Sequence, residues 1–252
     1  MILGRSSLAD AILPTRINGL DIIAGGREEV WGSQKTLTDD IAMGIWQFAL
    51  NAKSSLGYDI VVFDLGAGTH RDTTGFFVGA HLGLLTVLPE PTSIENAYMF
   101  LRASLLRLIE NCGGHLENSE AAAQMSQLLT HGLPGRPKPK TCAAGLLELN
   151  DVYPKFIQAV QLAIQSRTMG VIVNQARSQR DSDIASSMEM ITRSYFGLRA
   201  ASMGYLNYDD AACKSLRNRR LLTQDFPQSI LSRRLTELAA KVTKLVREGE
   251  SQ

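Results

Sequence analysis

The feature that most constrains the fold is a short apolar run that leads into a carboxylate and a small-residue loop. Ile60-Val-Val-Phe63 is followed directly by Asp64 and then by Gly66-Ala-Gly68. A continuous apolar run of this length predicts a strand buried on both faces, as in a parallel sheet. An acid at the carboxyl end of such a strand lies where open α/β sheets bind ligands, and small residues after it let backbone N–H groups approach an anion. The stretch therefore predicts the magnesium side of a phosphate-binding site.

The lysine-containing loop that normally faces such an acid is missing from the sequence. Phosphate-cradling loops of nucleotide hydrolases read G-x-x-x-x-G-K-[ST], or carry a second lysine. No Gly-Lys dipeptide occurs in the 252 residues, and no apolar strand followed by a glycine loop precedes Asp64 in the way that this site requires. The sequence thus predicts one half of a phosphate site without the other half.

The composition is that of an ordinary soluble globular protein. The chain is 44% hydrophobic and 20% charged, and its net charge of +1 gives no argument for binding nucleic acid, a membrane or acidic partners. Three scattered cysteines favour a reducing compartment over a disulfide framework. No apolar run reaches transmembrane length, and the first residues lack the pattern of a signal peptide. We therefore expect a cytoplasmic protein.

Strand and helix patterns alternate along the chain, which predicts an α/β fold with a doubly wound, mainly parallel sheet and helices on both faces. Besides 60–64, strands are expected at 20–24, 82–88, 170–174 and 199–206. Helices are expected at 8–18, 36–56, 72–80, 92–111, 151–166, 181–197, 209–218 and 228–247. Residues 112–145 are rich in Gly, Pro, Ser and Lys, and predict a surface insertion with one or two weak helices. The whole of 1–252 is expected to form a single domain.

Several polar residues near these elements have structural interpretations. Thr92-Ser-Ile-Glu95 fits a capping box at a helix start. The spacing of Cys112 and His115 suits a metal, but no second pair completes four ligands, so we expect no metal centre there. Arg177 and Arg180 fit either a solvated loop or contact with a partner subunit.

Segments in a fixed order along the chain resemble the MinD/ParA-type deviant-Walker P-loop ATPases, closest to the FlhG-like branch. They are Val61–Gly68, Leu88–Tyr98, Val171–Gln175, and Gly204–Asp210 followed by Asn218–Leu222. The resemblance runs from about residue 8 to residue 247. It implies an ATPase that uses ATP and Mg²⁺ and forms a homodimer with ATP between the subunits. Such a switch controls the position or number of a cellular structure, such as the division site, a partitioning chromosome or plasmid, or flagella.

The resemblance also implies roles for individual residues. Asp64 would hold Mg²⁺ through water, and Asp64 and Gly68 would be the catalytic positions. Gly66, Ala67 and Gly68 would form the loop that senses the γ-phosphate. Asn174 would hydrogen-bond adenine, because an amide matches the donor–acceptor edge of that base. The wall around the base would consist of Leu206, Asn207, Tyr208 and Asp209, and Asp209 is alternatively a helix N-cap.

The sequence departs from the family at its start. Family members begin with a strand, a lysine-bearing loop, a helix and a second strand that ends in aspartate, and none of these is found here. The missing first strand would neighbour the strand 60–64, so its absence leaves ladder groups unpaired. We expect an incomplete gene product whose parent is an ATPase. The alternatives are a missing segment supplied as a separate chain, or a shortened paralogue that acts as a non-hydrolysing pseudo-ATPase scaffold for a protein partner.

The resemblance implies partners as well. A second protein would stimulate turnover or be the one that is positioned, and a peripheral location at the inner membrane face is the alternative to the free cytoplasm. Membrane contact is not supported by the C-terminus, because the chain ends Gly249-Glu-Ser-Gln where the family carries a basic, apolar helix. A dinucleotide-binding enzyme is disfavoured, because Arg71 stands where a third glycine after Gly66 and Gly68 would be needed.

Overall fold

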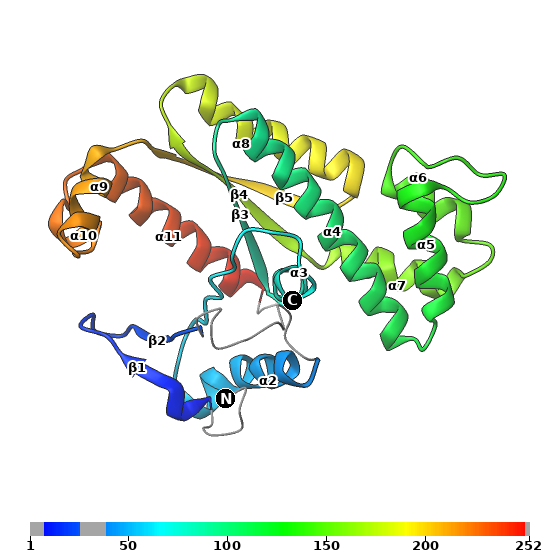
Figure 1. Cartoon of the computed structure of the whole chain (residues 1–252), viewed down its shortest axis with the longest axis horizontal. Helices are drawn as coiled ribbons and strands as arrows, with labels where there is room; N and C mark the ends of the chain where they lie inside the picture. Colours follow the sequence, from blue (N-terminus) through cyan, green and yellow to red (C-terminus); the bar gives the residue numbers. More distant parts are fainter. Residues whose placement is uncertain (1–7, 26–38, 250–252) are drawn as a thin grey trace. The chain divides into compact units, whose positions relative to one another are not determined.

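The computed structural model describes residues 8–25 and 39–249 (Figure 1). The chain divides into two compact units. The first comprises the residues up to Gly66 together with His70–Asp72, and the second comprises Ala67–Thr69 and the residues from Thr73 onward. The architecture is mixed α/β, with a three-stranded parallel sheet packed against helices and a small antiparallel hairpin.

The first unit holds the hairpin and one long helix. Strands β1 (Ile12–Pro14) and β2 (Asp21–Ile23) pair antiparallel after a single 3₁₀ turn, η1 (Ala9–Ala11). The helix predicted for 8–18 is therefore wrong beyond its first turn. Gly19, with φ 78°, turns the chain back in the left-handed conformation that glycine adopts without a steric penalty. Helix α2 (Asp39–Leu56) matches the prediction for 36–56 within the described residues.

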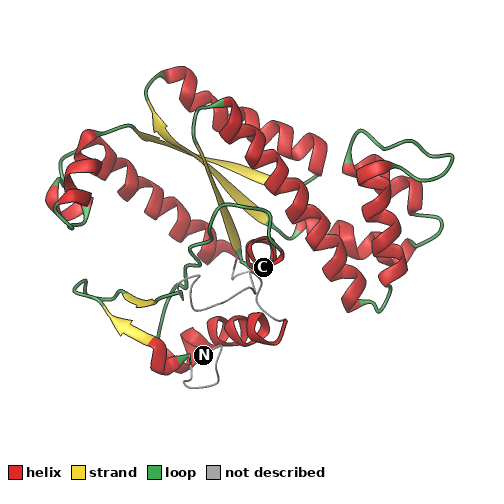
Figure 2. Ribbon diagram, viewed as in Figure 1, coloured by secondary structure: helices red, strands yellow, loops and turns green. Residues whose placement is uncertain are grey.

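The strand predicted at 60–64 does not form. Residues 57–70 run as a loop (Figure 2), and Val62 is 82% exposed while Ile60 and Val61 are each 43% exposed. Only Phe63 finds an aromatic neighbour along this run, the ring of Trp46 on α2 at 5.2 Å between centroids. A strand is stable only when its backbone pairs with a neighbour, and no described residue pairs with this segment. The run is apolar, as the sequence shows, but no strand among the described residues pairs with it and buries its side chains.

The second unit is built on a parallel sheet in the order β3-β4-β5. Its strands are β3 (Leu82–Val87), β4 (Thr168–Ala176) and β5 (Arg199–Asn207), which confirms the strands predicted at 82–88, 170–174 and 199–206. Leu82 lies opposite Thr168, which in turn lies opposite Arg199, so all three strands start level. The central strand is buried from Met169 to Val173, as its unbroken apolar run predicts.

Helices cover the sheet and extend beyond it. Helices α4 and α8 lie on one side of the sheet and α11 on the other (Figure 1). The helices of this unit and the π-helical turn η2 are α3 (Arg71–Gly79), α4 (Pro91–His115), α5 (Ser119–His131), α6 (Cys142–Leu149), α7 (Pro154–Gln165), α8 (Gln179–Ile191), η2 (Thr192–Phe196), α9 (Asp210–Arg217), α10 (Leu222–Asp225) and α11 (Ile230–Gly249). None of the described helices is long and apolar enough to cross a bilayer.

The segment 112–145 contributes to the core. Helices α5 and α6 bury Met125, Leu128 and Leu146 in the same cluster as the sheet residues. Helices α4 and α5 approach closely at Gly113, where an added Cβ would lie 2.5 Å from the Cβ of Ala122. The glycine that suggested a surface loop is therefore used for helix packing.

The start of α4 differs from the prediction. Helix α4 begins at Pro91 with Glu90 as N-cap, so the predicted capping box at Thr92–Glu95 is wrong. Ser93 instead accepts a hydrogen bond from the backbone N–H of Leu88 at 2.9 Å. Proline at the first helical position has the required φ and no N–H to satisfy, which moves the helix start forward.

Candidate functional site

The residues predicted to hold a base meet at the carboxyl ends of β4 and β5. The last paired residues are Ala176 and Asn207, and beyond them the N–H of Tyr208 donates to the carbonyl of Ala176 at 2.9 Å. The ladder is interrupted between Val173 and Ala176, where Gln175 takes the left-handed conformation with φ 57°. This irregularity sets the residues at the end of β4 apart from the regular sheet. Ligands of open α/β sheets bind at this edge.

Asn174 lies inside the irregular stretch and is partly exposed. Its side-chain oxygen accepts a hydrogen bond from the N–H of Gln175 at 2.9 Å. That bond fixes the amide plane and leaves the NH₂ group as a donor. Asn174 is predicted to hydrogen-bond adenine through a matching donor and acceptor, and in this geometry its oxygen is already engaged by Gln175 while its NH₂ group is left to donate.

A cation–π pair forms the flat surface of this edge. The guanidinium carbon of Arg177 lies 4.0 Å from the centroid of the Tyr208 ring. From the sequence, Arg177 fits either a solvated loop or a contact with a partner subunit. In the structure it lies over the Tyr208 ring of its own chain. No sequence pattern indicated this pair, although Arg177 and Tyr208 each follow directly on the last paired residue of adjacent parallel strands.

Tyr208 and Asp209 also organise the start of α9. The Tyr208 hydroxyl donates to Asp210 Oδ1 at 3.1 Å, and this hydrogen bond, with the charge of Asp210, raises the pKa of the phenol. Asp209 is the N-cap of α9 and accepts from the N–H of Ala211 at 2.9 Å. The N-cap alternative for Asp209 is confirmed, and its carboxylate is committed to the helix.

Asn207 holds an unsatisfied acceptor. Its Oδ1 is buried, and no hydrogen-bond partner lies near it in the described part of the chain. A buried amide oxygen without a partner costs about 1–3 kcal/mol, so such an atom marks a place where a donor is expected. Leu206 behaves differently, because it lines a hollow of about 170 Å³ between the sheet and α11, together with Ile172 and Lys241.

The loop from β4 into α8 is fixed by a capping box. Ser178 Oγ accepts from the N–H of Asp181, and Asp181 Oδ2 accepts from the N–H groups of Arg177 and Ser178 at 2.7 and 2.9 Å. Those hydrogen bonds, the one from Arg177 first, lower the pKa of Asp181. The backbone of Arg177 is thereby held in place beside Tyr208.

The residues predicted for the phosphate side are divided between the two units. Asp64 and Gly66 belong to the first unit, and both are exposed. Ala67 and Gly68 group with the second unit, and Gly68 has φ 126°, which favours glycine. Among the described residues no group of three or more His, Cys, Asp or Glu is placed to hold a metal ion. The structure thus brings Asn174, Asn207 and Tyr208, the base-side set, to the same edge of the sheet, and leaves Asp64 and Gly66 in a different unit.

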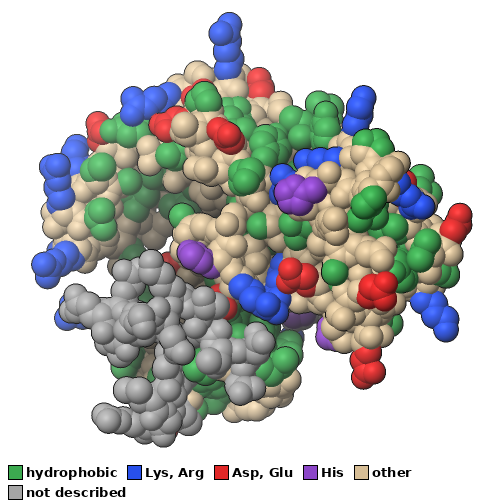
Figure 3. Space-filling model, turned by 45° about the vertical axis from the view of Figure 1, so that its right-hand side comes forward, with side chains coloured by type: hydrophobic (Ala, Val, Ile, Leu, Met, Phe, Trp, Pro, Cys, Tyr) green, Lys and Arg blue, Asp and Glu red, His purple; other side chains and the backbone are tan. Residues whose placement is uncertain are grey.

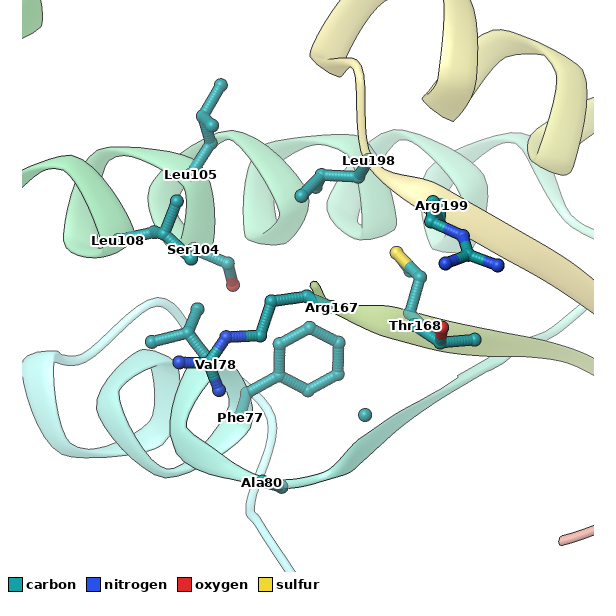
Figure 4. Close-up of a pocket in the computed structure, with 12 residues that line it drawn as sticks. Phe77, Val78, Ala80, Ser104, Leu105, Leu108, Arg167, Thr168, Leu198 and Arg199 are labelled. Atoms are coloured by element: carbon teal, nitrogen blue, oxygen red, sulfur yellow. The ribbon is translucent and has the colours of Figure 1, made fainter. Parts of the chain in front are cut away.

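A second, smaller cavity lies at the opposite, amino-terminal edge of the sheet (Figure 4). It measures about 30 Å³, and Phe77, Ser104 and Arg167 line it. Ser104 Oγ and Arg167 Nε are both buried without a hydrogen-bond partner in the described residues. Burial lowers the pKa of Arg167. A cavity of this size has room for roughly two water molecules, so we interpret it as a solvent site that satisfies these two polar atoms in a mostly apolar wall.

The charged side chains on one face of the molecule are of mixed sign. On the face seen in Figure 3, basic and acidic side chains of the described residues are interspersed. This agrees with a net charge of +1 for the whole chain.

Comparison with known proteins adds no relative. No family model matches the chain, and no curated protein matches it either. The resemblance to MinD/ParA-type ATPases therefore rests on the ordered segments of the sequence itself.

Proposed function

We propose that the second unit carries the base side of an ATP site and that the chain is an ATP-binding dimerisation switch of the MinD/ParA type. It would work in the cytoplasm, where a partner protein stimulates it and it sets the position or number of a cellular structure. The observation that carries this proposal is the convergence of Asn174, Asn207 and Tyr208 at the carboxyl ends of two adjacent parallel strands. The proposed fold is a doubly wound, P-loop-like sheet of which β3-β4-β5 is one part.

The chemistry of these groups suits adenine. If the unpartnered Oδ1 of Asn207, which is buried in this structure, becomes accessible on binding, it would accept from the 6-amino group of the base, and the NH₂ of Asn174 would donate to a ring nitrogen. The guanidinium–phenol pair of Arg177 and Tyr208 offers a flat face for stacking. An unpaired acceptor and a planar surface on consecutive residues favour a planar base that carries an amino group.

The phosphate side of the proposal rests on Asp64. Its carboxylate would hold Mg²⁺ through water, and the ion would neutralise charge on the β- and γ-phosphates. Gly66, Ala67 and Gly68 would offer backbone N–H groups to the terminal phosphate, since glycine and alanine leave room for an anion.

The experiment is ATP binding to the purified full chain with Mg²⁺, measured by calorimetry. We expect Tyr208→Ala to weaken binding roughly tenfold, because stacking on one aromatic ring is worth about 1–3 kcal/mol. Asn174→Ala should weaken binding to a similar extent by removing one hydrogen bond to the base.

Matched controls are Tyr195→Ala and Asn150→Ala. Tyr195 is 53% exposed against 42% for Tyr208, and Asn150 is exposed at the end of α6. Both control variants should bind ATP like the parent chain. Equal losses in the test and control variants would argue against a base site at the ends of β4 and β5.

The second candidate is a non-hydrolysing scaffold that binds a protein partner. The absence of any Gly-Lys dipeptide favours it, because phosphoryl transfer needs a cationic clamp on the phosphates. Phosphate release from ATP, measured with the parent chain and with Asp64→Ala, separates the two. Hydrolysis that Asp64→Ala abolishes supports the switch, whereas ATP binding without hydrolysis supports the scaffold.

A further inference from the structure

A groove of about 470 Å³ lies in the second unit between α4, the loop 138–142 and the junction of α8 with η2. It is separate from the base-side residues, none of which lines it. Its volume falls within the range of about 300–1,000 Å³ that is typical of small-ligand sites. A docked helix or protein would need a far larger surface, of roughly 800 Å² per partner.

The floor of the groove is apolar. Tyr98, Leu105 and Leu106 come from one face of α4, at spacings of seven and eight residues. Ile191 and Phe196 come from the other side, five residues apart, and η2 between them is a π-helical turn. A π turn brings residues five apart onto the same face, and such turns are rare and frequently occur at functional sites.

The rim of the groove is cationic. Arg102, Lys138 and Lys140 line it, and none of the lining residues is acidic. No carboxylate in the described ranges 8–25 and 39–249 forms an ion pair with these three side chains. Among the described residues, the Arg102 guanidinium donates one long hydrogen bond, from Nη2 to the carbonyl of Thr130 at 3.4 Å. The positive charge of these three side chains is therefore not neutralised by a described carboxylate, and it lies beside an apolar floor. An anionic ligand with an apolar part would complement both features.

The rim is held in one conformation by the preceding loop. Gly132 has φ 84°, and an added Cβ there would lie 2.7 Å from the carbonyl oxygen of Arg136 and 2.8 Å from the N of Lys138. Leu133 and Arg136 exchange two backbone hydrogen bonds of 2.8 Å, and Arg136 Nη1 donates to the carbonyl of Glu148 at 2.8 Å. The loop that leads to Lys138 and Lys140 is therefore preorganised, which lowers the entropic cost of binding.

The start of α6 closes the same end of the groove. Thr141 caps the helix, and Cys142, its first residue, lies buried in the groove wall. The partial positive charge of a helix N-terminus adds to that of the two lysines. Burial raises the pKa of the Cys142 thiol to about 12, so this cysteine stays neutral and adds no competing negative charge.

We propose that this groove binds a free amphiphilic anion, an acyl carboxylate of medium chain length. The carboxylate would lie among Arg102, Lys138 and Lys140, and the acyl chain would lie over Leu105, Leu106 and Phe196. The proposal does not depend on ATP binding, because none of the residues involved belongs to the base-side set.

The test is calorimetric titration of the full chain with dodecanoate below its micelle concentration, beside dodecanol and dodecylamine. We expect one dodecanoate site, dodecanol bound at least tenfold more weakly, and no dodecylamine binding. The double variant Lys138→Glu/Lys140→Glu should weaken dodecanoate binding at least tenfold, because both lysines are exposed and the change reverses the charge of the rim. Lys155→Glu/Lys214→Glu, which changes two exposed lysines outside the groove, should bind dodecanoate like the parent chain.

Two controls separate this site from other sources of binding. ATP binding should be the same in the parent chain and in Lys138→Glu/Lys140→Glu, which keeps the test distinct from that of the ATP site. Flotation with vesicles of anionic phospholipid distinguishes a bilayer surface from a free acyl anion. The proposal is overturned by equal affinity for dodecanoate and dodecanol, by an unaffected double variant, by the absence of dodecanoate binding, or by vesicle binding without dodecanoate binding.

Discussion

At the scale of single residues, Tyr208 is the residue on which the base-side site depends. Its ring faces Arg177, its hydroxyl donates to Asp210, and its N–H donates to the carbonyl of Ala176. These three interactions tie the end of β4 to the start of α9. A residue with this many fixed neighbours is preorganised for contact with a ligand.

Asp181 gives a pH-dependent prediction at the same scale. Hydrogen bonds from Arg177 and Ser178 lower the pKa of Asp181 in the folded chain below its ordinary value of 3.8. The stabilisation it contributes is therefore complete above that ordinary value and is lost as pH falls through the lowered pKa. We expect the difference in unfolding free energy between the parent chain and Asp181→Ala to be constant near neutral pH and to shrink below about pH 4.

Urea unfolding at several pH values checks this expectation. Asp183→Ala is the matched control, because Asp183 is an exposed carboxylate on the same helix. Its effect on the unfolding free energy should be small and similar at every pH. A difference for Asp181→Ala that grows at low pH would contradict the assigned hydrogen bonds.

The sequence anticipated part of this site. Asn174, Asn207, Tyr208 and Asp209 were predicted to lie together, and the structure brings them to the ends of neighbouring strands. The Arg177–Tyr208 pair and the left-handed Gln175 were not predicted. Both follow from the irregular register between β4 and β5, which no local pattern in the sequence encodes.

At the scale of elements, prediction worked where local pattern and tertiary pairing agree. The strands at 82–88, 170–174 and 199–206 form because each has a neighbour in the sheet. The apolar run at 60–63 has the same composition but no ladder partner among the described residues. An apolar run predicts burial only when another element supplies the covering surface, and a single sequence does not show whether one is available.

Val62 tests this difference directly. Val62 is 82% exposed, whereas Val171 on β4 is fully buried. Val62→Thr should change the unfolding free energy by less than about 0.5 kcal/mol. Val171→Thr should cost about 1–3 kcal/mol, because it buries a hydroxyl in an apolar environment. Urea unfolding measures both, and a large loss for Val62→Thr would mean that the 60–63 run is buried after all.

Two adjacent glycines test how α4 packs against α5. Gly113→Ala should cost about 1–3 kcal/mol, because the new methyl group would lie 2.5 Å from the Cβ of Ala122. Gly114→Ala has no atom within 4 Å of the new methyl group, and it should stabilise the helix by up to about 1 kcal/mol. Thermal unfolding of the two variants side by side checks the prediction, and equal effects would contradict the packing of α4 on α5.

At the scale of the whole molecule, the proposed base-side site lies within a single unit. The base-side residues belong to the second unit, whereas Asp64 belongs to the first. The second unit holds the parallel sheet and the main hydrophobic core. Hydrogen bonds to a base discriminate between bases. The second unit should therefore bind one nucleotide base more tightly than another, even where contacts to the phosphates add little affinity.

The most direct test of the proposed function is therefore the affinity of the full chain for ATP and for GTP, measured by calorimetry with Mg²⁺. Guanine presents an oxygen where adenine presents an amino group, so GTP would leave Asn207 Oδ1 without a donor. We predict ATP binding at least about tenfold tighter than GTP binding, which corresponds to about 1.4 kcal/mol. Equal affinity for the two nucleotides, or no binding of either, would contradict the proposal of an adenine site at the ends of β4 and β5.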